Sequence, residues 1–169
     1  MRLAAALLGL TLGAAAAAAA QDSAPSPSWL VGVGVANYAL AEIHGTGWGP
    51  EGVVRRRLGA TMVIQARVTV IPSSSGFYDF GGAAADLGVG VLAGSRTLEV
   101  ALVAGASGLA GGDSDGSFFT AGGVHLMAQV TGWLGRTAGL YANLATRLLA
   151  GSGTDYGTTS GAAGVAFRF

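Results

Sequence analysis

Apolar and polar residues alternate with a period of two along most of the chain from residue 29 onward. Ile64 and Val68, for example, fall on one face of their segment, and Gln65 and Arg67 fall on the other. Successive side chains of a β-strand point to opposite faces, whereas a helix would repeat every 3.6 residues. The pattern therefore predicts an all-β domain over residues 29–169.

Turn residues divide this pattern into eight segments. The predicted strands are residues 29–41, 50–57, 60–71, 77–93, 97–109, 117–133, 138–150 and 156–169. Short turns are expected at 57–59, 94–96 and 135–137, and longer connections rich in Gly, Ser and Asp at 42–49, 72–76, 111–116 and 151–155. Long and short connections alternate strictly, as in antiparallel outer-membrane barrels.

Charged residues within the segments lie opposite the aliphatic face. They are too few to solubilise an outer surface, and the segments exceed the five or six residues usual in globular proteins. We therefore expect a closed, eight-stranded, antiparallel up-and-down transmembrane barrel with its aliphatic face toward lipid. A polar network is expected in the lumen, made of Gln65, Arg67, Asp86, Glu99, His125, Gln129, Asn143, Arg147 and Arg168.

The first 28 residues are predicted to be removed or to serve as a linker. Arg2 precedes an apolar run at 3–12, and small residues lead up to Gln21. This order is typical of a secretory signal peptide, which we assign to residues 1–20. Residues 21–28, rich in Pro and Ser, form a short linker before the barrel.

Aromatic residues gather near the segment ends. Tyr and Trp are enriched where a membrane meets water, so the sequence predicts two girdles. Their expected members are Trp29, Tyr38, Phe77, Tyr78, Phe118, Phe119, Trp133 and Tyr156.

Composition narrows the choice of function. Of the 169 residues, 51% are apolar and 11% are charged, which argues against a disordered chain. The formal net charge of zero argues against nucleic acid as a partner. Cysteine is absent, which excludes thiol catalysis and disulfides. Residues 113–116 (Asp-Ser-Asp-Gly) faintly resemble the start of a calcium-binding loop, but no Glu follows at the spacing that such a loop requires. We therefore expect no metal, and we expect no cofactor.

Charge is distributed unevenly between the two predicted ends. Arginines at 55–57, 96, 136 and 168 belong to the side with short turns. Acidic residues are expected in the longer loops, at Glu42, Glu51, Asp79, Asp113, Asp115 and Asp155. We interpret these acids as solvated surface charge.

The last residues of the chain form a pattern of glycine and aromatic residues. Gly164, Phe167 and Phe169 place a glycine five residues before a terminal aromatic and a second aromatic two before it. With the eight-segment pattern, this chain end resembles the small outer-membrane barrels of the OmpA/OmpX-like class. The resemblance implies insertion into a Gram-negative-type outer membrane by the barrel-assembly machinery, with membrane lipids as partners. Ala162 departs from the class, which usually has a polar residue there.

An eight-stranded barrel is only just wide enough for its own side chains. We therefore expect a monomeric structural or surface-interaction protein, rather than an enzyme or a diffusion pore. Two alternatives remain open. One is a lipid-modifying or omptin-like proteolytic enzyme, for which His44 with loop aspartates, or His125, supply the base. The other is a soluble, lipocalin-like periplasmic ligand-binding barrel.

Overall fold

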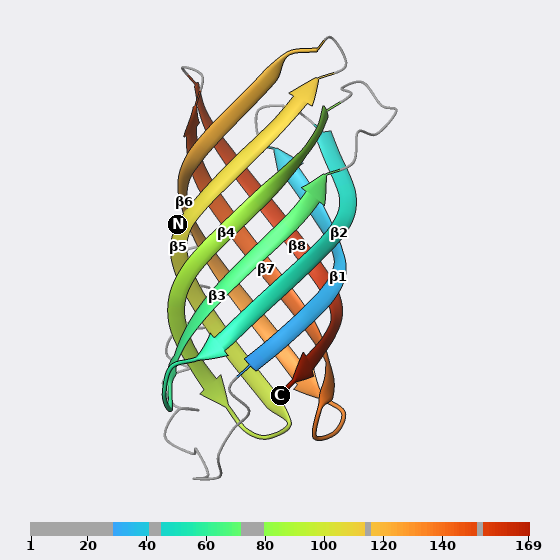
Figure 1. Cartoon of the computed structure of the whole chain (residues 1–169), viewed down its shortest axis with the longest axis vertical. Helices are drawn as coiled ribbons and strands as arrows, with labels where there is room; N and C mark the ends of the chain where they lie inside the picture. Colours follow the sequence, from blue (N-terminus) through green and yellow to red (C-terminus); the bar gives the residue numbers. More distant parts are fainter. Residues whose placement is uncertain (1–28, 41–44, 72–79, 114–115, 152–153) are drawn as a thin grey trace, which may run out of the picture.

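Eight antiparallel strands close into a single barrel (Figure 1). The computed structural model describes residues 29–40, 45–71, 80–113, 116–151 and 154–169. The strands are β1 (Trp29–Leu40), β2 (Gly45–Arg57), β3 (Met62–Ile71), β4 (Phe80–Gly94), β5 (Leu98–Asp113), β6 (Phe118–Trp133), β7 (Ala138–Gly151) and β8 (Thr154–Arg168). Each strand pairs with the next, and β1 pairs with β8. The predicted fold class is confirmed.

Several strand boundaries differ from the prediction at the end with the longer connections. β2 begins at Gly45 instead of residue 50, and β5 continues to Asp113. The sequence GTGWGP in β2 lacks apolar alternation, yet Gly47 and Gly49 lie opposite Tyr38 and Ala36 of β1. Backbone pairing sets the strand there, and glycine carries no side chain from which periodicity can be recognised.

The three short turns lie at one end of the barrel, at the bottom of Figure 1, and we call it the turn end. They connect β2 to β3, β4 to β5 and β6 to β7, as predicted. Gly59 and Gly94 adopt φ angles of 138° and 139°, which L side chains rarely adopt. β1 begins and β8 finishes at the same end, and the opposite end is the loop end.

The aliphatic face of the barrel points outward. Val89 and Leu144 expose 54% and 61% of their surface, whereas Arg67 and Arg147 expose 1% each. A water-soluble barrel has the reverse arrangement, with its aliphatic side chains around the central axis. Among the described residues, no helix is long and apolar enough to cross a membrane.

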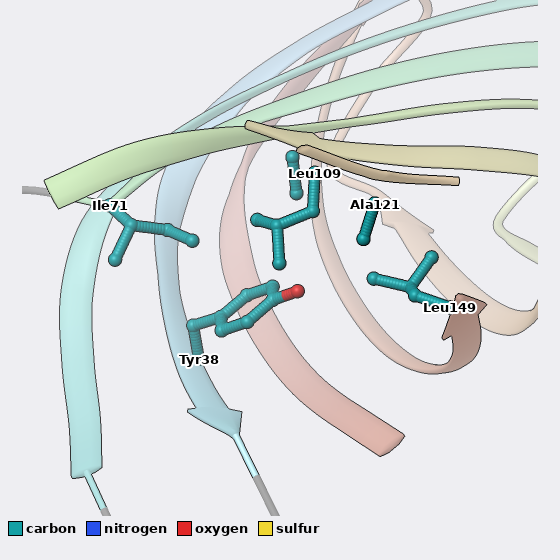
Figure 2. Packing of buried hydrophobic residues seen from close by; sticks show 6 residues of the cluster. Tyr38, Ile71, Leu109, Ala121 and Leu149 are labelled. Carbon is teal, nitrogen blue, oxygen red and sulfur yellow. The ribbon is translucent and has the colours of Figure 1, made fainter. Parts of the chain in front are cut away.

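The lumen is filled in layers along the barrel axis. At the loop end an apolar cluster gathers around Tyr38, whose ring points toward its neighbours in Figure 2. Its other buried members are Ile71, Ala84, Leu109, Ala121 and Leu149. Two further apolar clusters lie nearer the turn end, around Met127 and around Tyr141. Polar and charged side chains occupy the middle of the barrel, between the cluster at the loop end and the two clusters nearer the turn end.

Candidate functional site: the charged interior of the barrel

Four buried charged residues meet in the middle of the lumen. Glu51, Arg67, Asp86 and Arg147 project inward from β2, β3, β4 and β7, and we call them the central cluster. Two acids face two arginines, so the cluster is formally neutral. Neutrality matters because an unpaired charge in a dry interior costs several kcal/mol, on the order of 3–5.

Asp86 is the centre of the cluster. Arg67 donates to Oδ2 of Asp86 from Nε at 2.8 Å and from Nη2 at 2.6 Å. Arg147 donates from Nε to Oδ1 at 2.8 Å and from Nη2 to Oδ2 at 2.7 Å. The hydroxyl of Ser107, which lies opposite Asp86 on β5, also donates to Oδ1. One carboxylate therefore neutralises parts of two guanidinium groups.

Glu51 accepts the hydrogen bonds on the other side of the cluster. Its Oε1 accepts from Nδ2 of Asn143 at 2.7 Å and from the hydroxyl of Tyr141 at 3.1 Å. Its Oε2 lies 3.4 Å from Nη1 of Arg67, and that same nitrogen donates to Oδ1 of Asn143 at 3.1 Å. Asn143 thereby joins the arginine to the glutamate across the barrel.

Neutral polar side chains continue the network toward the turn end. Nε2 of Gln65 donates to Oε1 of Gln129 at 2.9 Å, and Nε2 of Gln129 donates to Thr131 at 3.2 Å. His125 is buried beside the central cluster, with Nδ1 3.1 Å from the carbonyl oxygen of Ala106 and 3.8 Å from Oδ1 of Asp86.

A second group of ion pairs lies at the turn end of the barrel. Glu99 accepts from Arg55, and it accepts from Nη2 of Arg57 at 3.1 Å. Arg168 was expected in the polar network of the lumen, but it binds no acid among the described residues. Its guanidinium donates to the carbonyl oxygens of the two neighbouring turns and lies 4.2 Å from the ring centre of Trp133. We call Arg55, Arg57 and Glu99 the mouth cluster.

Glycines of β1 and β8 make room for the ring of Tyr141. A Cβ at Gly34 would lie 2.7 Å from the Tyr141 hydroxyl oxygen and would also meet the carbonyl oxygen of Ala163. A Cβ at Gly164 would lie 2.8 Å from Cε1 of the same ring. The absence of side chains at these positions lets Tyr141 reach across the lumen to Glu51.

The girdle prediction is wrong for three aromatic residues. Tyr38 and Trp133 are buried inside the barrel, and Phe119 packs against the apolar cluster at the loop end. Strand parity explains the error, since Tyr38 shares the inward face with Gly34 and Ala36. A position near a strand end does not by itself bring a side chain to the lipid.

Other aromatic side chains do lie on the outward face. Trp29 and Phe118 are exposed, as are Phe167 and Phe169 of the terminal motif. Trp48 falls within the connection predicted at 42–49, but it lies exposed on β2. Phe77, Tyr78 and the side chain of Tyr156 lie outside the described part of the chain, and so does His44.

Sequence reasoning missed two charged residues of the lumen. Glu51 was expected in a solvated loop, and Arg55 was assigned to the side with the short turns without a place in the lumen network, but both are buried. Glu51, Val53 and Arg55 alternate along β2 and therefore lie on one face of the strand. Recognising that this face points inward would have placed all three side chains in the lumen. Glu51 and Arg55 both fall within the predicted segment 50–57, but Gly52 and the arginine run at 55–57 leave that segment without the apolar alternation that marks an inward face.

The described interior lacks a recognisable catalytic arrangement. The Ser107 hydroxyl donates to Asp86 instead of to His125, so this histidine does not activate it. No group of three or more His, Asp or Glu side chains suited to a metal ion occurs among the described residues. The contacts that are present are those of a buried, mutually neutralising polar network.

Solved structures with the same fold are outer-membrane barrels. The Neisserial surface protein A matches with a TM-score of 0.70 at 15% identity, over 83% of this chain and 97% of that one. Ail, the attachment invasion locus protein of Yersinia pestis, matches at 0.64 and 10% identity, over 86% and 100%. The N-terminal barrel domain of Pseudomonas aeruginosa OprF matches at 0.55 and 13%, over 83% and 97%. No protein-family model and no curated protein sequence matches this chain.

Proposed function

We propose that this chain is an integral outer-membrane protein with a structural or surface-interaction role. In this proposal a signal peptide directs export, the barrel-assembly machinery inserts residues 29–169, and the polar lumen stays closed to general diffusion. The short turns face the periplasm, and the longer connections face the outside.

The observation that supports this proposal most strongly is the inverted distribution of side chains. Aliphatic residues such as Val89 and Leu144 cover the outside, while the central cluster is buried. An aliphatic exterior of this kind is stable only in hydrocarbon, because water would drive it inward. The shared fold with solved outer-membrane barrels points to the same location.

The two alternatives have less support. A lipocalin-like soluble barrel needs an apolar interior, but the middle of this lumen holds Glu51, Arg67, Asp86 and Arg147. For the enzyme alternative, the hydrogen bonds of Ser107 and His125 in the described interior do not form a base–nucleophile pair, and His44 lies outside the described residues. The proposal therefore predicts that expression leaves lipid A composition and test-peptide cleavage unchanged.

Membrane fractionation in a Gram-negative host tests the location. We expect the chain in the outer-membrane fraction, resistant to carbonate extraction, and migrating faster in a detergent gel before boiling than after it. Leu144→Asp, on the lipid face, should reduce insertion strongly. The matched control Thr137→Asp lies in an exposed turn and should insert normally. Recovery of the unaltered chain in the detergent-free soluble fraction would refute the proposal.

A further inference from the structure

A small hollow opens at the turn end of the barrel, beside the mouth cluster. It is partly open to solvent. Its lining residues are Trp29, Leu30, Arg55, Arg57, Glu99, Trp133 and Arg168. Three arginines and two tryptophans from four strands therefore surround one opening.

The charges around this hollow do not balance. Arg55 and Arg57 share the single carboxylate of Glu99. Within the described residues, the hydrogen bonds of Arg168 reach only carbonyl oxygens. The lining thus carries three positive charges and one negative charge. This contrasts with the central cluster, where two arginines meet two acids. An excess of buried or half-buried guanidinium groups calls for an anion.

Unpartnered hydrogen-bond donors mark the same place. In the described part of the structure, three buried side-chain polar atoms lack a hydrogen-bond partner. Two of these are Nη1 of Arg55 and Nε1 of Trp133, and both residues line the hollow. Both atoms are donors, and buried donors are normally satisfied. An anion in the hollow would lie beside both side chains and would balance the excess positive charge.

We propose that this hollow binds a phosphate group. The planar guanidinium fork matches phosphate oxygens, and charge-assisted hydrogen bonds of this kind are roughly twice as strong as neutral ones. The hollow is small and partly open to solvent, so a phosphate group would sit at its opening with the remainder of the ligand outside. The inference goes beyond the proposed function, and binding of a free phosphate ester does not depend on it.

Two sources can present this chemistry. Trp29 forms one wall and is also exposed on the outward face, with the guanidinium of Arg56 5.2 Å from its ring centre. A lipid headgroup in the adjoining leaflet can therefore reach the hollow from the side. A soluble phosphate ester can enter along the barrel axis. A lipid probe and a soluble ester probe distinguish these two sources.

The test titrates the detergent-solubilised barrel with two phosphate probes. Glycerol 3-phosphate represents the free ester, and a short-chain phosphatidylglycerol mixed into nonionic micelles represents the lipid, both against sodium chloride of equal ionic strength. The indole N–H resonance of Trp133 reports occupancy directly, and Trp133→Phe identifies it. We expect a saturable shift with at least one probe. Saturation with the lipid alone would show that the hollow binds a lipid headgroup. Saturation with the ester alone would show that it binds a soluble phosphate ester. Saturation with both would show a phosphate site that is open to either source.

Three variants make the test specific. Arg57→Gln should weaken binding by about tenfold, as expected for one lost charge-assisted hydrogen bond. Arg56→Gln removes the same charge from the neighbouring outward position and should change affinity less than about twofold. Glu99→Gln removes the competing carboxylate and should tighten binding, an effect that damage to the fold cannot imitate. Equal losses in the Arg56 and Arg57 variants, weaker binding in the Glu99 variant, or no saturation with either probe would overturn the inference.

Discussion

Asp86 holds the interior together at the scale of single residues. Its carboxylate is bonded to Arg67, Arg147 and Ser107, which come from three different strands. Because Arg67 also reaches Glu51, loss of Asp86 affects the two arginines unequally. Within the described part of the chain, Arg147 would then retain only Ser160 as a side-chain hydrogen-bond partner, at 3.0 Å.

Replacing Asp86 by Asn should therefore be costly. We expect a loss of about 3–5 kcal/mol in the free energy of unfolding, because a buried guanidinium is left without its counter-charge. Equilibrium urea titration in phospholipid vesicles measures it. Combining the change with Arg147→Met removes the stranded charge, so the double variant should lose less than the sum of the two single losses. Strictly additive losses would show that the two side chains are energetically independent.

Gly34 provides a second test at the same scale. Gly34→Ala should cost about 1–3 kcal/mol, because the added methyl group meets the β8 backbone and displaces the Tyr141 hydroxyl from Glu51. Gly52→Ala is the matched control, since a Cβ at Gly52 meets nothing within 4 Å. Thermal unfolding in detergent compares the two. Equal stability of the two variants would contradict the close packing of Tyr141.

At the scale of elements, alternation predicted strand existence well and strand ends poorly. Where valine and leucine alternate with polar residues, as in β3 and β7, the pattern shows both the strand and its inward face. Where glycine replaces them, as at the start of β2, hydrogen bonding to β1 sets the boundary. The same lack of alternation leaves the inward face of the predicted segment 50–57 unassigned, and Glu51 was therefore grouped with the acids of the loops.

The turn between β4 and β5 is the element whose geometry is most demanding. Gly94 has φ 139°, and a Cβ there would meet the carbonyl oxygen of Leu98. We expect Gly94→Ala to cost about 1–3 kcal/mol through backbone strain. Gly135→Ala, in the turn after β6 with nothing within 4 Å of its Cβ, should be nearly neutral. Urea titration of both variants in vesicles checks the difference, and an equally stable Gly94 variant would disprove the strain.

At the scale of the whole molecule, parity predicts which side chains enter the lumen but not which of them pair. Gln65, Arg67, Asp86 and Arg147 were each placed inside from their own strands. Their partners depend on how far neighbouring strands are staggered and on where β8 meets β1, and these relations connect residues far apart in sequence. For the same reason, the mouth cluster could not be predicted from any single segment.

Conductance tests whether the filled lumen blocks passage. Because the central cluster and the apolar layers on either side of it occupy the interior, we expect no large, stable conductance steps from the purified barrel. Planar-bilayer recordings at neutral pH make the measurement, with a large diffusion porin as positive control. Large, long-lived open states would show that the network leaves a continuous water path.

The orientation of the aliphatic face is the central claim, and site-directed spin labelling tests it most directly. The chain has no cysteine, so a single nitroxide can be placed at Val89, Leu144 or, as a control, Arg136 in the exposed turn. In lipid vesicles, the labels at Val89 and Leu144 should collide freely with oxygen and poorly with a water-soluble nickel complex, and the label at Arg136 should do the opposite. Strong nickel collisions at Val89 and Leu144 would mean that this face meets water, and the account would be wrong.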